Sequence, residues 1–176
     1  MAKPKNIAII GGGAAGVFSA IAAAEASPDA SIHVFEKSAK LLGKVLISGG
    51  GRCNVTHACF DPNELIENYP RGFREFLGPF NKFGCGDTME WFTDRGVELK
   101  IENDNRVFPV SNESSTIVNC LLDFAKRAGV QFHLRHGLKS IIKENNSFSL
   151  HFESGDITSF DRVLIASGSS KRLWSE

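Results

Sequence analysis

Two glycine clusters carry the residues of this sequence that are best suited to bind a ligand through the backbone. The first, "IIGGGAAG" (residues 9–16), contains the spacing Gly11-x-Gly13-x-x-Gly16. The second, "LISGGGRCNVTH" (residues 46–57), continues directly into an arginine, a cysteine and an asparagine. Because glycine has no β-carbon, either loop can lie flat against a ligand and direct N–H groups at it.

The elements around the first cluster predict a β-α-β unit. Asn6–Ile10 is a short apolar run with β-branched residues, which favours a buried parallel strand. Ala14–Ala26 is rich in alanine and predicts a helix that ends before Pro28. Ser31–Glu36 is a second apolar run and predicts the second strand. The glycines therefore lie where a strand turns into a helix.

In that setting each glycine of the first cluster has a predicted role. Gly11 allows a tight turn, Gly13 lets the backbone approach a pyrophosphate, and Gly16 lets the helix pack closely. The helix N-terminus offers N–H groups to the phosphates. Glu36 ends the second strand, where a carboxylate accepts hydrogen bonds from ribose hydroxyls and repels the 2′-phosphate of NADP. The alternative is a glycine-rich turn with Glu36 in solvent.

The second cluster favours a cofactor longer than one nucleotide. The sequence shows no helical period from Ser38 to Ala58, and we predict an extended loop there. Arg52 could neutralise a pyrophosphate or a substrate anion. Asn54 and Thr56 could form hydrogen bonds with the edge of a flavin. A methyltransferase that uses S-adenosylmethionine on a similar fold would have no use for this second loop.

Local signals predict the remaining elements. Asp61 and Pro62 begin a short helix, and Asp87 with Glu90 forms a capping box before a helix that ends at Gly96. The other expected elements are a hairpin of residues 97–101 and 106–110, a helix over residues 116–128, and strands at residues 130–134, 138–143, 147–153 and 161–166.

Composition limits the classes of protein to be considered. The chain has 176 residues, which predicts one domain over residues 1–176, and its net charge of zero argues against binding to nucleic acid or a membrane surface. The four cysteines form no CxxC pair, and the N-terminal segment does not resemble a signal peptide. We therefore expect a cytoplasmic protein with reduced thiols.

Three segments carry a resemblance to a known family. "GKVLISGGGRCNVTH" (residues 43–57), "NRVFPVSNESSTIVNCLL" (105–122) and "DRVLIASGSS" (161–170) resemble the HI0933-like (BaiN-type) flavoproteins. These belong to the two-dinucleotide-binding-domain superfamily, and the resemblance covers essentially the whole chain. It implies an α/β, Rossmann-like FAD-binding domain. Members of the family are longer, so we expect an N-terminal portion that lacks most of the substrate domain.

The resemblance also implies which residues contact FAD. Gly11, Gly13 and Gly16 would face the pyrophosphate, Glu36 the ribose, and the backbone of Leu138 the adenine. The full implied set is Gly11, Gly13, Ala14, Ala15, Gly16, Glu36, Lys37, Lys44, Gly49, Gly50, Gly51, Arg52, Cys53, Asn54, Leu138, Ala166, Ser167 and Gly168. Ser169 replaces the second glycine of the family's "ATGG", which reduces backbone freedom there. No catalytic acid or base emerges.

Other residues suit chemistry less specifically. Cys53 and Cys59 could form a redox pair, but the resemblance favours Cys53 as a packing residue. Adding His57 gives three potential ligands within seven residues and no second cluster, which argues against a metal site. Cys85 and Cys120 are expected to be ordinary core or near-surface thiols.

Two aromatic stretches and the histidines leave alternatives open. The segment Arg106–Ser111 either walls a flat ring with Phe108 and Pro109 or packs as the end of a hairpin. Residues 71–82 interleave three basic residues with phenylalanines, a pattern that could stack single-stranded nucleic acid, but core packing is the better interpretation. The histidines His133, His136 and His151 are expected to be packed or solvated rather than catalytic.

The sequence thus favours an FAD-dependent oxidoreductase. A hydride would pass between the flavin and an unidentified small-molecule substrate or NAD(P)H. Two alternatives remain: a fragment that binds nucleotide without turnover, and a flavin-dependent enzyme that modifies RNA.

Overall fold

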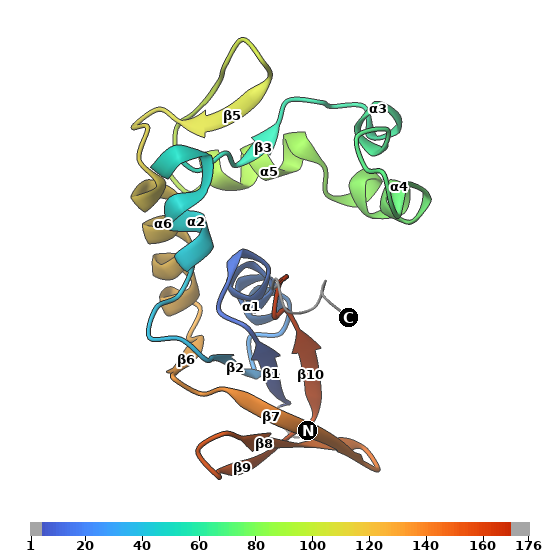
Figure 1. The fold of residues 1–176 in the computed structure, drawn as a ribbon, viewed down its shortest axis with the longest axis vertical. Helices are drawn as coiled ribbons and strands as arrows, with labels where there is room; N and C mark the ends of the chain where they lie inside the picture. The colour runs from blue at the N-terminus through green and yellow to red at the C-terminus, as the bar shows by residue number, and fades with distance from the viewer. Residues whose placement is uncertain (1–4, 170–176) are drawn as a thin grey trace. The chain divides into compact units, whose positions relative to one another are not determined.

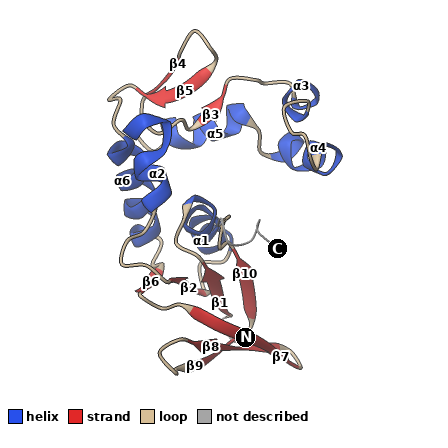
Figure 2. Cartoon of the chain, in the orientation of Figure 1, coloured by secondary structure: helices blue, strands red, loops and turns tan. Residues whose placement is uncertain are grey.

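The computed structural model describes residues 5–169. Residues 1–4 and 170–176, including Ser170 at the end of "DRVLIASGSS", lie outside the described range. The chain divides into two compact units (Figures 1 and 2). The first contains the chain up to Lys44 and again from Leu121 onward, and the second contains Val45–Cys120.

A four-stranded parallel sheet forms the centre of the first unit. Its strands run in the order β10-β1-β2-β6, with bounds β10 (Arg162–Ile165), β1 (Asn6–Ile10), β2 (Ser31–Glu36) and β6 (Gln131–Leu134). The chain moves from β1 to β2 and β6 on one side and places β10 on the other. The strand order therefore reverses between β1 and β10, the point at which doubly wound sheets bind their ligands.

Helix α1 (Ala14–Ala26) follows β1 directly and has the predicted bounds. Its alanines favour helix, and its larger apolar side chains Val17 and Ile21 are 0% and 1% exposed. Burial of each of these two contributes about 1.5–3 kcal/mol. The helix ends at the Ser27 cap, immediately before Pro28.

A separate antiparallel sheet covers part of the parallel one. It consists of β7 (Leu138–Glu144), β8 (Ser147–Phe152) and β9 (Ile157–Phe160) in that order. Leu150, Phe152 and Phe160 from this sheet form one buried cluster with Ala8, Ile10 and Phe35 from the parallel sheet. The strand candidates after residue 129 therefore belong to two different sheets.

The second unit combines short helices with a small antiparallel sheet. Its sheet has the order β3-β5-β4, from β3 (Thr56–His57), β5 (Arg106–Pro109) and β4 (Leu99–Ile101). The β4–β5 pair is the predicted hairpin. The helices are α3 (Pro62–Ile66), α4 (Phe73–Lys82) and α5 (Cys85–Thr93), and α6 (Ser114–Arg127) leads the chain into the first unit.

Helix capping agrees with the prediction at one site and differs at another. The side chain of Asp61 caps α3 by accepting a hydrogen bond from the Asn63 N–H at 2.8 Å. The expected capping box at Asp87 and Glu90 is wrong. Helix α5 begins earlier, and Asp87 occupies its third position and accepts a hydrogen bond from the Gly84 N–H at 2.7 Å.

Two further expectations are wrong. The segment predicted as an extended loop contains helix α2 (Gly43–Ile47) and a 3-10 helix (Ser48–Gly51). Each is about one turn long, so neither shows a repeating apolar period. Helix α4 was expected to pack in a core, yet none of its residues is buried, and Phe73 and Phe76 are exposed.

Within residues 5–169, no helix has both the length and the apolar character that crossing a bilayer requires.

Candidate functional site

The glycines of the first loop occupy three different environments. Gly11 has φ +113°, and a β-carbon there would overlap the carbonyl oxygen of Ala166. A β-carbon at Gly16 would overlap the carbonyl oxygen of Gly11, so this glycine allows α1 to approach the turn. Gly13, by contrast, has open space within 4 Å of its missing β-carbon. Two glycines therefore serve the turn itself, whereas Gly13 faces free space at the start of α1.

Glu36 lies beside this loop at the end of β2. Its carboxylate accepts hydrogen bonds from the backbone N–H of Gly12 and of Ser38, both at 2.8 Å. Burial alone would raise the pKa of Glu36, but these hydrogen bonds outweigh it and lower the pKa below its usual 4.5. The side chain is thus a fixed carboxylate at neutral pH, held against the glycine loop.

The segment after β10 completes one side of the first loop. The N–H of Ala166 donates to the carbonyl of Ile10 at 2.8 Å, which extends the β1–β10 pairing to the turn. Gly168 has φ +69°, a conformation that favours glycine. Lys44 donates from Nζ to the carbonyl of Ser169 at 2.6 Å. Lys44 therefore links the start of α2 to the segment that follows β10.

The remaining predicted residues of the first unit lie on its surface or at a strand end. Ala14 and Ala15 are exposed in the first turn of α1, and Lys37 is exposed after β2. Leu138 is half-buried at the start of β7. The N–H of His136 donates to the carbonyl of Glu36 at 2.9 Å, which fixes the chain just before Leu138 beside the end of β2.

The second glycine loop has an unusual backbone. Gly49, Gly50 and Gly51 have φ values of +56°, +69° and +85°, so three consecutive residues are left-handed. A β-carbon at Gly49 would lie 2.8 Å from the backbone N of Asn54, whereas Gly50 and Gly51 face open space. Side chains are therefore disfavoured by conformation at all three positions and excluded by contact at Gly49.

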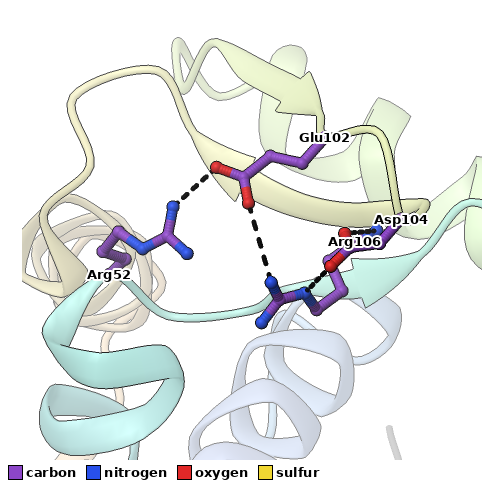
Figure 3. Close-up of polar contacts among 4 residues, drawn as sticks. All are labelled: Arg52, Glu102, Asp104 and Arg106. Carbon is purple, nitrogen blue, oxygen red and sulfur yellow. Dashed lines mark hydrogen bonds and ion pairs between the residues drawn. The ribbon is translucent and has the colours of Figure 1, made fainter.

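Arg52 is held in place by neighbours on the β4–β5 hairpin (Figure 3). Its Nη1 donates to Glu102 Oε1 at 2.6 Å, and its Cζ lies 3.9 Å from the centre of the Phe108 ring. The other oxygen of Glu102 lies 4.0 Å from Arg106 Nη2, and Arg106 Nε donates to Asp104 at 2.7 Å. The side chains of Arg52 and Glu102 are 33% and 27% exposed, so the pair stabilises the unit by only about 0.2–1 kcal/mol. The main effect of the Arg52–Glu102 pair is to orient the guanidinium of Arg52.

The side chains of the two residues after Arg52 interact with other residues of the second unit. Cys53 is 6% exposed and has φ +60°, and burial raises the pKa of its thiol. That shift is opposite to the one a reactive cysteine requires. With its amide oriented to donate, the side-chain nitrogen of Asn54 lies 2.8 Å from the Thr56 carbonyl and 3.2 Å from the Val107 carbonyl.

The other candidates of the sequence are placed as follows. Phe108 is fully buried, and the hydroxyl of Ser111 lies 2.7 Å from that of Thr116. Cys59 is half-buried, and none of the four cysteines forms a disulfide. In the part of the chain that the structure describes, no group of three or more potential ligands could hold a metal ion.

Sequence reasoning missed three partners of these residues. Gly12 and Ser38 hold Glu36, and Glu102 holds Arg52. Gly12 had a visible signal, because it is the middle glycine of the first cluster. Glu102 had none, since 50 residues separate it from Arg52 and only the hairpin brings them together.

The first unit therefore gathers its predicted residues at the carboxyl ends of β1, β2 and β10, and the second unit holds residues 49–54. The model of the HI0933-like protein Rossmann domain matches residues 5–172. The chain belongs to the HI0933-like family. This confirms the family predicted from the sequence and its Rossmann-like fold, that of FAD-binding domains.

Two named relatives of the family resemble this chain over most of its length. A 3-dehydro-bile acid delta(4,6)-reductase of Clostridium scindens is 30% identical over 97% of this chain and 41% of its own length. A ribosomal RNA dihydrouridine synthase of Escherichia coli is 28% identical over 91% of this chain and 38% of its own length. The chain therefore spans about two fifths of these relatives.

Solved structures share the fold at lower identity. A quinol fumarate reductase of Escherichia coli matches with a TM-score of 0.69 and 18% identity, over 97% of this chain and 33% of its own. A 3-ketosteroid dehydrogenase of Rhodococcus jostii matches with a TM-score of 0.68 and 15% identity, over 94% of this chain and 46% of its own. At these identities the two matches show the fold alone.

Proposed function

We propose that this chain is the FAD-binding part of a flavin-dependent oxidoreductase, with residues 1–176 acting as one cofactor-binding domain. The observation that carries the proposal is the arrangement at the end of β1. Gly13 leaves open space at the start of α1, and the carboxylate of Glu36 is fixed beside the same loop. The family and its reductase relative support the same class.

The residues present fit FAD. A diphosphate needs room beside bare backbone and a helix N-terminus, and Gly13 provides both. An adenosine ribose needs an acceptor at the end of the second strand, and Glu36 is ionised there. Gly11, Ala14, Ala15 and Gly16 would shape the same diphosphate site, with Lys37 beside the ribose and the backbone of Leu138 at the adenine.

The rest of the predicted set would hold the flavin end. Lys44 already donates a hydrogen bond to the carbonyl of Ser169, the residue after the turn Ala166–Gly168. Lys44 and this turn would pass close to the cofactor. When bound, the isoalloxazine ring supplies hydride transfer. The chain's own contribution is to orient it: the bare backbone of Gly49–Gly51 would lie against it, and Arg52 would direct its guanidinium at an anion of the cofactor or substrate.

The proposal also covers the electron donor, the substrate and the cellular compartment. The negative charge of Glu36 disfavours NADP at this nucleotide site. Because FAD would occupy the site, NAD(P)H would bind elsewhere as the donor. A small-molecule substrate is the simplest expectation from the reductase relative. The four free thiols fit a reducing compartment, and we place the protein in the cytoplasm.

The visible absorption spectrum of the purified protein tests the proposal first. Bound flavin gives bands near roughly 370 and 450 nm. The spectrum should be recorded for this chain and for the longer gene product, each with and without added FAD. A protein that stays colourless in both forms after incubation with FAD would overturn the proposal. A yellow long form beside a colourless chain would show that further residues close the site.

A second candidate function is modification of RNA by the same cofactor. The observation that favours it is the similarity to ribosomal RNA dihydrouridine synthases of two bacteria, Escherichia coli and Haemophilus influenzae. The net charge of zero does not favour it. RNA binding through phosphates should weaken steeply with salt. If the flavin-loaded protein fails to bind ribosomal RNA fragments even at low salt, this candidate is eliminated.

A further inference from the structure

A hollow of about 420 Å³ lies in the first unit, apart from the glycine loop. It is lined by the rings of His33, His133 and His136, by Phe35 and Phe160, and by the carboxylate-bearing Asp156. Its volume falls within the range of small-molecule sites. None of these residues belongs to the proposed FAD site, so the hollow has no assigned role.

The hollow and the glycine loop lie on different parts of the sheet. Side chains alternate along β2, so His33 and Phe35 share one face, whereas Ile32 and Val34 share the other. Phe35 packs with Phe152 and Phe160 of the antiparallel sheet, which places the hollow on that face. The lining also includes Asn6, at the opposite end of β1 from Gly11. We therefore expect a ligand here to leave the proposed FAD site free.

The rings of His33 and His133 lie side by side in nearly one plane, and His133 stacks on Phe35. The ring of His133 lies 4.5 Å from that of Phe35 at an interplanar angle of 13°, and 5.3 Å from that of His33 at 16°. His33 Nδ1 is 3.0 Å from His133 Nε2, and His33 Nε2 is 2.9 Å from the hydroxyl of Ser31. These hydrogen bonds therefore hold the two imidazoles as one flat surface, which favours a flat ligand.

The charge of the hollow favours a cation. Burial first, and then the neighbouring imidazole, lower the pKa of both His33 and His133 below 6.5, so these rings are neutral at neutral pH. The third ring, His136, donates from Nδ1 to the Leu134 carbonyl at 2.8 Å. The β8–β9 turn contributes Asp156, and no lysine or arginine is among the lining residues that the structure describes. The site thus combines aromatic rings with one carboxylate.

We propose that this hollow binds a flat aromatic cation, with the coplanar imidazoles of His33 and His133 as its wall and Asp156 as its counter-charge. Aromatic rings attract cations through their electron-rich faces, and a carboxylate at the rim adds charge complementarity. A neutral ring of the same shape gains only the stacking. Protonation of His33 or His133 would place positive charge in the hollow and weaken the binding of a cation.

The test compares 1-methylnicotinamide, a flat cation, with neutral nicotinamide. Both are titrated into the protein with and without excess FAD, followed by calorimetry and by the NMR signals of the imidazole protons. The cation should bind about three- to thirtyfold more tightly than the neutral ring, the product of an exposed cation–π contact and a surface ion pair with Asp156. Because burial holds the pKa of His33 and His133 below 6.5, the affinity for the cation should stay level down to that pH and fall as the pH drops below it.

Two exposed carboxylates provide the variant and its control. Asp156→Asn keeps an acceptor for the Ser154 hydroxyl, which donates to Asp156 at 2.7 Å, but removes the charge. It should reduce the preference for the cation by about two- to fivefold, whereas Glu144→Gln, outside the hollow, should leave it unchanged. Equal affinity for both probes, an unchanged preference in Asp156→Asn, or competition with FAD would overturn the proposal. Because the titration is also carried out without FAD, its result does not depend on whether the protein binds flavin.

Discussion

Replacing Gly13 by alanine separates cofactor binding from folding. Gly13 caps α1 in an extended conformation, φ −83° and ψ −171°, that alanine also adopts. The added methyl group would meet no protein atom within 4 Å. It would instead occupy the space that the proposed diphosphate needs. We therefore expect Gly13→Ala to fold normally and to lose FAD.

The structure sets the size of both effects. Alanine is a poorer N-cap than glycine by about 0.5–1 kcal/mol, but it restricts the unfolded chain, which stabilises by about 0.4–1 kcal/mol. These terms nearly cancel, so the free energy of unfolding without flavin should change by less than about 1 kcal/mol. Loss of one charge-assisted hydrogen bond to a phosphate costs about 1.5–3 kcal/mol, which weakens FAD binding about ten- to a hundredfold.

The assay is a fluorescence titration with FAD, paired with denaturant unfolding of the flavin-free protein. Gly86→Ala is the matched control, because its added carbon meets only the Phe60 ring at 3.8 Å, an ordinary contact in α5. Gly16→Ala provides the opposite case: its β-carbon would overlap the Gly11 carbonyl oxygen, so it should unfold more easily. Wild-type FAD affinity in Gly13→Ala would refute the assignment of the first loop to the diphosphate.

Three further predictions follow from the described residues. Hydrogen bonds outweigh burial and keep the folded-state pKa of Glu36 below 4.5, so its carboxylate stabilises the fold above that pH, and this contribution is lost as the pH falls. Glu36→Gln should therefore flatten the acid limb of stability measured by urea unfolding and weaken FAD binding; unchanged FAD affinity would exclude a ribose contact. Burial lowers the pKa of His33 and His133, so the unfolded chain takes up protons more readily, and stability should fall as the pH drops below 6.5. His133→Phe should make that loss shallower, and an unaltered pH profile would contradict the neutral pair. Gly50→Val should cost about 1–2 kcal/mol of stability through its left-handed backbone and abolish flavin binding, whereas normal flavin content would remove this loop from the site.

Local signals were sufficient for the first third of the first unit. Asn6–Ile10, Ala14–Ala26 and Ser31–Glu36 have the predicted bounds. Each is delimited by residues with strong intrinsic preferences, namely the glycines after Ile10 and Pro28 after the helix. Backbone sterics decide these boundaries within a few residues, so they can be read without knowledge of the fold.

Local signals failed to predict elements that are too short to show a repeating apolar pattern. The α2 and 3-10 helices span only Gly43–Gly51, and the left-handed conformations of Gly49–Gly51 determine their geometry. Glycine permits those angles but does not require them, because it adopts both signs of φ with similar ease. The sequence therefore predicts that the backbone is free there, and the fold decides how that freedom is used.

The sequence by itself determined the family, the β1–α1–β2 unit and the residue types of both glycine loops. Tertiary structure decided which strands pair: residues 131–134 join the parallel sheet, whereas 138–144 begin a separate one, although both are short apolar strands. It also decided which charges meet, since Glu102 reaches Arg52 only through the hairpin. The physical reason is the same in each case. Backbone preferences act between neighbouring residues, whereas strand pairing and ion pairing depend on contacts that exist only after the chain has folded.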